Sequence, residues 1–310
     1  AMAKRISIGT WAYALGPYAD RSIPFAEVVE RLAELGFDGL ELGTFGGHPN
    51  PETLNNKDKR DEVRALWESK GLGCSGLAAD FGNEKLITAV KRDSYLAAFK
   101  RNVHFCHDLA INVIRVDTLE PPGALGEIPG EEPGPLVVDY DDALNRVVGT
   151  WQECCKIAAD LDVRVVWEFE PGFAFNRPSD IFRILDRVNE DNFYTLLDTS
   201  HANMIAVHGA RQVGEKETLA GGVTELVQRL EGKVGRVHLI DSDGTLHDGK
   251  SSTHTPFGQG EMDFDEIMPA VVAGSCPDDW WTIDLCFCPE AWEATAECKR
   301  FVEELAEKYG

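Results

Sequence analysis

Apolar residues along this chain follow two alternating patterns. Short apolar runs rich in β-branched and aromatic residues indicate buried strands, and each is followed by a stretch in which apolar residues recur at helical spacing. In residues 24–36 that spacing places one apolar face on a helix (Phe25, Val28, Val29, Leu32 and Leu35). Eight such units succeed one another. Strands are expected at residues 6–13, 38–45, 74–82, 112–119, 164–173, 193–202, 234–244 and 280–287.

Eight strand–helix units predict an α/β protein with the (β/α)8 TIM-barrel fold. The chain has 310 residues, and we expect a single domain over residues 4–310, with 1–3 as a cloning remnant. A doubly wound open sheet is the alternative, but residues 9–20 lack its glycine-rich phosphate-binding fingerprint. Long loops at 120–136 and 242–263 are expected over the C-terminal face of the barrel, the second as a lid. Helices are expected near 215–231 and over 290–309.

Ionisable side chains gather late in the predicted strands. Side chains at positions i and i+2 of a strand share a face, so Glu168 and Glu170 are expected to point together into the barrel lumen. The same parity places the acids and imidazoles of strands 5 to 8 on the lumen face (Glu168, Glu170, Asp198, His238 and Asp284), with Glu41, Asp80 and Asp117 nearby. TIM-barrel enzymes hold their active sites at this C-terminal end.

Several carboxylates in one lumen repel each other unless a cation lies among them. Oxygen ligands from three strands and one imidazole suit Mn²⁺, Mg²⁺, Zn²⁺ or Co²⁺. Each residue also has a structural interpretation, because Arg115 and Arg236 could neutralise Asp117 and a neighbouring acid, and Glu41 is as well explained structurally as functionally. The eight cysteines include no Cys-x-x-Cys pair, so we expect reduced thiols rather than a thiolate zinc site.

The charge of the chain limits its partners. Its formal net charge is −23, from 53 acidic and 30 basic residues, which excludes a nucleic-acid partner held by clustered Lys and Arg. No run of 18 apolar residues occurs, and the N-terminus lacks a secretory signal pattern. We therefore expect a cytoplasmic protein that contacts no membrane.

Five motifs in order carry a resemblance to a known superfamily: "WEFEPG", "LLDTSHAN", "RVHLID", "PFGQGEMDF" and "TIDLCF". This set resembles the xylose-isomerase-like barrels, the sugar (phosphate) isomerases and epimerases. The resemblance implies metal ligands at four positions, Glu168, Asp198, His238 and Asp284, with Mn²⁺ as the first choice. It also implies that His201 contacts substrate. Glu170 is the alternative ligand on the fifth strand; with Glu168 on the metal, Glu170 acts as a base or orienter.

The chain departs from the epimerases of this superfamily at two places. They typically carry Glu on the eighth strand and an Arg shortly after the seventh-strand His; here Asp284 and Gly244 stand instead. Enolisation by a single base remains possible. The segments "ISIGTWAYALGPY", "EFEPGF" and "IDLCFCPEAW" are similar to the α subunits of C-glycoside deglycosidases, which implies a 3-keto C-glucoside substrate and a small β-sandwich β subunit.

Other residues of the predicted barrel mouth are candidates for substrate binding. Trp11 and Phe45 could stack on a sugar or aryl ring, although core packing explains them equally well. Asp117 is a further candidate contact. His254 could also reach substrate, but its loop position favours a solvated side chain. His104 and His107 are expected on the outside of the third helix.

We therefore predict a metal-dependent enzyme that enolises a keto sugar and cleaves the C-glycosidic bond of a 3-keto C-glucoside by β-elimination. Ketose–aldose isomerisation or 3-epimerisation is the alternative. An endonuclease-like barrel acting on abasic DNA disagrees with the acidic charge, and a metal-free, non-catalytic subunit is the remaining possibility. An oligomer is expected.

Overall fold

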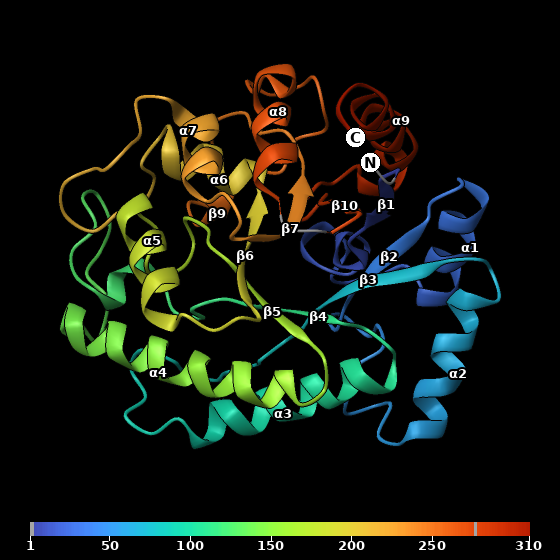
Figure 1. Cartoon of the computed structure of the whole chain (residues 1–310), viewed down its shortest axis with the longest axis horizontal. Helices are drawn as coiled ribbons and strands as arrows, with labels where there is room; N and C mark the ends of the chain where they lie inside the picture. Colours follow the sequence, from blue (N-terminus) through green and yellow to red (C-terminus); the bar gives the residue numbers. More distant parts are fainter. Residues whose placement is uncertain (1–2, 276–277) are drawn as a thin grey trace.

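Eight parallel strands form a barrel in the computed structural model, which describes residues 3–275 and 278–310 (Figure 1). The strands are β1 (Arg5–Ile8), β2 (Gly39–Gly43), β3 (Gly73–Ala78), β4 (Val113–Val116), β5 (Arg164–Glu168), β6 (Phe193–Asp198), β7 (Val234–Leu239) and β10 (Trp280–Ile283). Their order is β1-β10-β7-β6-β5-β4-β3-β2. A parallel bridge from Gly9 to Glu41 joins the two ends of the sheet. The predicted TIM barrel is confirmed.

Helices surround the barrel (Figure 1). They are α1 (Phe25–Glu34), α2 (Lys57–Glu68), α3 (Asp93–Asp108), α4 (Tyr140–Ala159), α5 (Pro178–Val188), α6 (Thr199–Ala206), α7 (Gly222–Arg229), α8 (Phe264–Gly274) and α9 (Ala291–Tyr309). The main core fills the layer between helices and sheet, where Trp167 of β5 packs on Trp151 of α4 with ring centroids 5.4 Å apart. The apolar strand faces thus meet the helices, and the polar faces are left for the lumen.

Short elements decorate the strand ends. The 3₁₀ helices are η1 (Thr10–Tyr13), η2 (Gly16–Tyr18) and η3 (Pro122–Ala124), and a small hairpin joins β8 (Leu246–His247) to β9 (Ser251–Ser252). In the hairpin turn Asp248 and Gly249 both have positive φ, 50° and 67°. Such left-handed pairs are favoured in tight hairpins, and Asp-Gly is a typical sequence for them.

Several strands end earlier than the sequence predicts. β5 ends at Glu168, so Glu170 lies in the loop that follows the strand. β6 ends at Asp198 because the carboxylate of this residue caps α6, accepting a hydrogen bond from the His201 backbone N–H at 3.0 Å. β1 gives way to η1, and β10 ends at Ile283. Apolar runs that continue past a strand cannot be told from strand by periodicity alone.

Two helices were predicted with explicit bounds, and the structure matches one of them better than the other. The helix expected near 215–231 is shorter, since α7 covers only Gly222–Arg229, whereas α9 matches its prediction. The seven described cysteines are free thiols; Cys276 and residues 1–2 lie outside the described residues. Within the described segments, none of the helices has the length and apolarity needed to cross a membrane.

Both long loops lie at the C-terminal face as predicted. Arg211, which follows α6, holds them there: its guanidinium donates to Glu131 of the first loop at 2.8 and 2.9 Å and to the Lys250 carbonyl of the second at 3.5 Å. The end of the second loop is fixed by buried Asp241, which accepts hydrogen bonds from the backbone of Gly258 and Gly260 at 3.0 Å. A Cβ at Gly260 would lie 2.3 Å from Asp241 Oδ1, so only glycine permits this approach.

Candidate metal centre

Four buried side chains converge at the C-terminal end of the barrel. They are Glu168 at the end of β5, Asp198 at the end of β6, His238 in β7 and Asp284 directly after β10, and each offers one ligand atom within 4.8 Å of the others. Asp198 lies opposite His238 in the β6–β7 ladder, so strand register itself brings these two together. Atoms bound to one ion at about 2.1 Å lie up to roughly 4.2 Å apart, so small side-chain shifts would complete a site.

The imidazole of His238 is held in one orientation. Its Nε2 lies 2.9 Å from Glu41 Oε2, an arrangement that typically fixes metal-binding histidines. Its Nδ1 lies 3.3 Å from Glu168 Oε2 and 3.4 Å from Asp284 Oδ2. Within the described part of the chain, neither His238 Nδ1 nor Glu168 Oε2 has a hydrogen-bond partner, although both are buried. Two unsatisfied buried atoms that face each other suit a shared ion.

The other two carboxylates are also fixed from behind. Asp198 uses Oδ1 as the cap of α6. Asp284 Oδ1 accepts hydrogen bonds from Trp11 Nε1 at 2.9 Å and from the Cys286 backbone at 3.0 Å. Trp11 can lie this close only because Gly9 has no side chain, since a Cβ there would be 2.1 Å from the indole ring. The second oxygen of each acid, Oδ2, therefore faces the centre, where Asp198 Oδ2 also lies 3.0 Å from His254 Nε2.

The electrostatics of the cluster call for positive charge. Burial by itself would raise the pKa of Glu168, but Arg115 and His238 hold this pKa well below its usual range. Burial would lower the pKa of His238, yet Glu41 and the other surrounding acids raise it well above its usual value. The acids thus favour a cation at their centre, which a divalent metal ion would supply.

Glu170 and His201 form a second pair beside this cluster. His201 Nε2 lies 3.6 Å from Glu170 Oε2 and 4.0 Å from Glu168 Oε2. The other ring nitrogen, Nδ1, lies 2.7 Å from the Ser252 hydroxyl of β9. Burial raises the pKa of Glu170, and the nearby Glu168 charge adds to this, while His201 opposes it. A carboxyl group with a raised pKa next to an imidazole is suited to proton transfer.

Arg115 of β4 joins the two groups. Its Nε donates to Glu168 Oε1 at 2.7 Å, its Nη1 donates to Asp117 Oδ2 at 2.7 Å, and its Nη2 lies 3.8 Å from Glu170 Oε2. The ion pair between Arg115 and Asp117 that the sequence suggested is present, and Arg236 likewise pairs with Glu41 at 3.3 Å. Asp117 also accepts from the Leu119 backbone at 2.7 Å, so both of its oxygens are bonded.

His254 corrects the sequence prediction of a solvated loop side chain. The residue is only 5% exposed, and its Nε2 lies 3.0 Å from Asp198 Oδ2 and 3.6 Å from Asp284 Oδ2. Burial would lower its pKa, but these two acids raise it to about 10. Ser200 Oγ of α6 donates a hydrogen bond to the Thr253 carbonyl at 2.9 Å, which holds the loop backbone next to His254 against the start of this helix. Ser252 of the same hairpin was not predicted, since no local pattern marks a serine that packs on a distant histidine.

Two further sets of potential ligands share members with the first. One contains Asp198, His201 and His254, and the other contains Glu168, Glu170 and His201. The four-residue set includes Glu168 and not Glu170. The paired histidines that the sequence places on the third helix, His104 and His107, are exposed on α3 and lie apart from the cluster.

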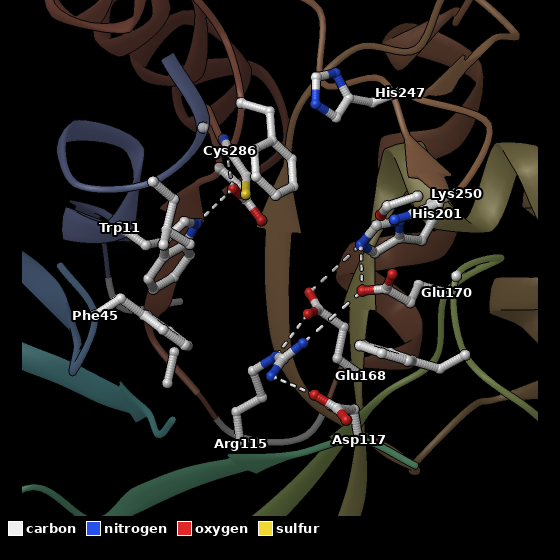
Figure 2. Close-up of a pocket in the computed structure, with 18 of the residues that line it drawn as sticks. Trp11, Phe45, Arg115, Asp117, Glu168, Glu170, His201, His247, Lys250 and Cys286 are labelled. Carbon is white, nitrogen blue, oxygen red and sulfur yellow. Dashed lines mark hydrogen bonds and ion pairs between the residues drawn. The ribbon is translucent and has the colours of Figure 1, made fainter. Parts of the chain in front are cut away.

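A cavity of about 740 Å³ opens directly above these residues (Figure 2). Figure 2 shows Trp11 and Phe45 on one side of it and Glu170 and His201 on the other. Its wall is rich in aromatic rings, namely Trp11, Phe45, Phe81, Phe173 and Phe287. Phe287 stacks on His247 of the hairpin with ring centroids 4.6 Å apart. A cavity of this volume falls in the range that holds drug-sized ligands.

Known proteins of the same architecture support this description. Solved structures with similar folds include the IOLI protein with a binding zinc atom (18% identity, TM-score 0.69, covering 99% of each chain). A D-tagatose 3-epimerase-like protein (19%, 0.68, 99% of this chain and 100% of that chain) and D-psicose 3-epimerase in the presence of D-fructose (15%, 0.70, 97% and 99%) are also similar. At such identities the likeness shows the fold alone. No curated protein sequence matches the chain.

The family follows from a separate comparison. A family model described as the xylose isomerase-like TIM barrel matches residues 29–308. That range includes the four residues of the cluster and every barrel strand except β1. With nearly the whole barrel matched, the chain belongs to the xylose isomerase-like TIM-barrel family.

Proposed function

We propose that this protein is a divalent-metal-dependent enzyme that enolises a keto sugar and isomerises or 3-epimerises it. The observation that carries the proposal is the pairing of Glu170 with His201, 3.6 Å apart, beside a buried four-residue ligand set at a cavity of about 740 Å³. Proton abstraction next to a carbonyl needs such a base close to a positive centre. The sugar epimerases of the same fold support a sugar as substrate.

Each group has a proposed role. Glu168, Asp198, His238 and Asp284 would hold the ion, Mn²⁺ first with Mg²⁺, Co²⁺ and Zn²⁺ as alternatives, which when bound polarises the substrate carbonyl as a Lewis acid. Glu170 takes the proton from the carbon next to the carbonyl. His201, held by Ser252 at 2.7 Å, donates a hydrogen bond or a proton to the neighbouring oxygen. Return of the proton from Glu170 to the adjacent carbon, with transfer of the hydroxyl proton of the first carbon back to His201, completes an isomerisation.

The environment of Asp284 bears on isomerisation against epimerisation. An epimerase needs acid–base groups on both faces of the substrate, and the second would have to come from Asp284, the acid directly after β10. Asp284 is held by Trp11 and the Cys286 backbone on Oδ1, while its Oδ2 faces His238 and His254. This favours proton transfer from the Glu170 side only, and hence ketose–aldose isomerisation over 3-epimerisation.

A direct test measures enolisation itself. Protein loaded with Mn²⁺ is incubated in D₂O with D-fructose, D-psicose, D-tagatose and D-xylulose, and deuterium at the carbon next to the carbonyl is followed by NMR. We expect incorporation with at least one ketose and formation of its aldose or epimer. A Glu170→Gln variant, matched in size, should lose about 10²- to 10⁴-fold in exchange rate. Absence of exchange with every ketose, in protein that binds Mn²⁺, would overturn the proposal.

The aromatic cavity favours a second candidate function. Five aromatic side chains in a 740 Å³ cavity offer more apolar surface than a free sugar uses, which agrees with an aryl C-glycoside. Here removal of the C2 proton of a 3-keto C-glucoside would place the electron pair in an enolate. Its collapse would form a C1–C2 double bond and break the bond from C1 to the aglycone, whose carbon takes up a proton as it leaves. Release of free aglycone from a 3-keto C-glucoside, without ketose turnover, would favour this function. The β-sandwich partner and an oligomer stay predictions.

A further inference from the structure

Arg115 presents unused hydrogen-bond donors to the cavity next to Glu170. Its side chain starts on β4 and lines the cavity, and Figure 2 shows its guanidinium between Glu168, Glu170 and Asp117. We infer that Arg115 is a substrate-binding residue whose Nη2 donates hydrogen bonds to an uncharged oxygen of the substrate. This inference rests on the proposed function. It gives Arg115 a role in substrate binding in addition to its structural ion pairs, which do not explain why Nη2 faces the cavity.

The guanidinium is only partly used by the protein. A guanidinium has five N–H donors in a rigid, planar fork. Glu168 takes Nε and Asp117 takes Nη1, each at 2.7 Å, and these two bonds fix the plane of the group. Among the described residues Nη2 makes no hydrogen bond, because Glu170 Oε2 is 3.8 Å away. The two N–H groups on Nη2 are therefore available to a ligand oxygen beside the base.

The charges around Arg115 determine what kind of oxygen it binds. Two carboxylates at 2.7 Å already offset its single positive charge, and Glu170 adds a third acid nearby. At this position a phosphate or carboxylate ligand would meet three acids and a guanidinium whose charge those acids already offset. A hydroxyl or carbonyl oxygen needs only the donors. The chemical class that fits is the oxygen of a neutral polyol or keto sugar.

The same donors would act on the reaction as well as on binding. When Glu170 takes a proton from a carbon next to the carbonyl, negative charge develops on the substrate oxygens. A donor fixed in advance stabilises that charge without reorganising, and loss of one such donor typically costs about 10²- to 10³-fold in rate. Arg115 is fixed in this way by its bonds to Glu168 and Asp117.

The test is the variant Arg115→Lys, which keeps the positive charge for the two acids but loses the planar fork. Binding of D-fructose to Mn²⁺-saturated protein is measured by calorimetry, and exchange in D₂O is measured by NMR. We expect D-fructose affinity to fall about tenfold or more, as for hydrogen bonds to charged groups, and kcat to fall about 10²-fold. Saturating Mn²⁺, with its binding measured separately, removes any indirect effect through Glu168.

Arg60→Lys is the matched control. Arg60 also pairs with an acid, Asp108 at 3.0 Å, but on the outside of the barrel between α2 and α3. It should change neither D-fructose binding nor exchange. Wild-type affinity in Arg115→Lys, or a wild-type protein that binds no neutral ketose, would overturn the inference. If wild type binds D-fructose without exchange and Arg115→Lys still weakens binding, the proposed function fails and the role of Arg115 stands.

Discussion

At the scale of single residues, Glu168 at the end of β5 and Glu170 in the loop after it differ in their contacts. Glu168 has one oxygen on Arg115 at 2.7 Å and the other 3.3 Å from His238 Nδ1, whereas the nearest ionisable side chain to Glu170 among the described residues is His201, 3.6 Å away. We expect Glu168→Gln to lower Mn²⁺ affinity by more than the 10- to 100-fold that a supporting residue costs. Glu170→Gln should leave that affinity within a few-fold. Calorimetric titration with Mn²⁺ checks both, and equal losses in the two variants would contradict the assignment.

The alternation of side chains along a strand explains which residues of the candidate site could be predicted from the sequence. It placed Glu168, His238 and Asp284 on the lumen side, because side chains alternate along any strand whatever its neighbours. It could not place His254, which reaches Asp198 only because a loop far along the chain folds back over α6. Nor could it show that Arg115 contacts Glu168 as well as Asp117, since that bond spans two strands. Contacts between elements are fixed by the three-dimensional packing.

Among the elements, the β8–β9 hairpin contributes to the centre through Ser252. This serine lies 2.7 Å from His201 Nδ1 and so determines how the ring presents Nε2 to Glu170. Ser252→Ala should leave Mn²⁺ affinity unchanged and lower kcat about tenfold, because the imidazole loses the bond that selects its tautomer. Rates of D₂O exchange measure this. Ser69→Ala, at the exposed end of α2, is the control, and an unchanged kcat in Ser252→Ala would refute the role.

The ion pair between Arg211 and Glu131 is one of the contacts that hold the loop over residues 120–136 at the barrel mouth. Arg211 contacts both oxygens of Glu131 at 2.8 and 2.9 Å, and the Arg211 side chain is 10% exposed. Glu131→Gln should speed limited proteolysis within this loop several-fold and raise KM, because a partly buried pair is lost while the fold remains. Glu132→Gln changes an exposed neighbour and serves as control. Equal cleavage rates in the two variants would show that the ion pair between Arg211 and Glu131 does not hold the loop.

The sequence could name this loop and its side of the barrel but not its attachment. Proline and glycine mark an irregular segment, and its place after a strand puts it at the C-terminal face. Glu131 and Arg211 are 80 residues apart, and neither belongs to a repeating pattern. The start of α6 was missed for a related reason. The sequence predicts a strand that continues past Asp198, but a capped helix can begin within an apolar run.

At the scale of the whole molecule, a bound ion should stabilise the fold. A ligand at 100 times its Kd adds about 2.7 kcal/mol to the free energy of unfolding. For a domain of this size that corresponds to a rise in Tm of roughly 5 °C. We expect wild-type protein to show this rise when Mn²⁺ is added and to lose it with EDTA, as followed by calorimetry. Glu168→Gln should show little rise, and an equal rise in both proteins would place the ion elsewhere.

The balance of charge predicts a preference for unphosphorylated sugars. Six carboxylates line the cavity, against three Arg and Lys side chains (Arg115, Arg211 and Lys250) and His254, whose pKa the neighbouring Asp198 and Asp284 raise to about 10. The two arginines are paired with acids, while in the described part of the chain Lys250 forms no ion pair within 4.0 Å. The net charge of −23 adds a long-range repulsion for anions.

We therefore expect kcat/KM for D-fructose to exceed that for D-fructose 6-phosphate at least tenfold in 20 mM salt. The long-range part of this difference should shrink as salt increases, since the screening length is about 10 Å at 0.1 M. The part due to the cavity acids should persist. Steady-state kinetics on both sugars at two salt concentrations separate the two parts. Equal efficiency at low salt would mean that Lys250 captures the phosphate at the mouth, which Lys250→Ala would reveal by abolishing activity on the phosphate alone.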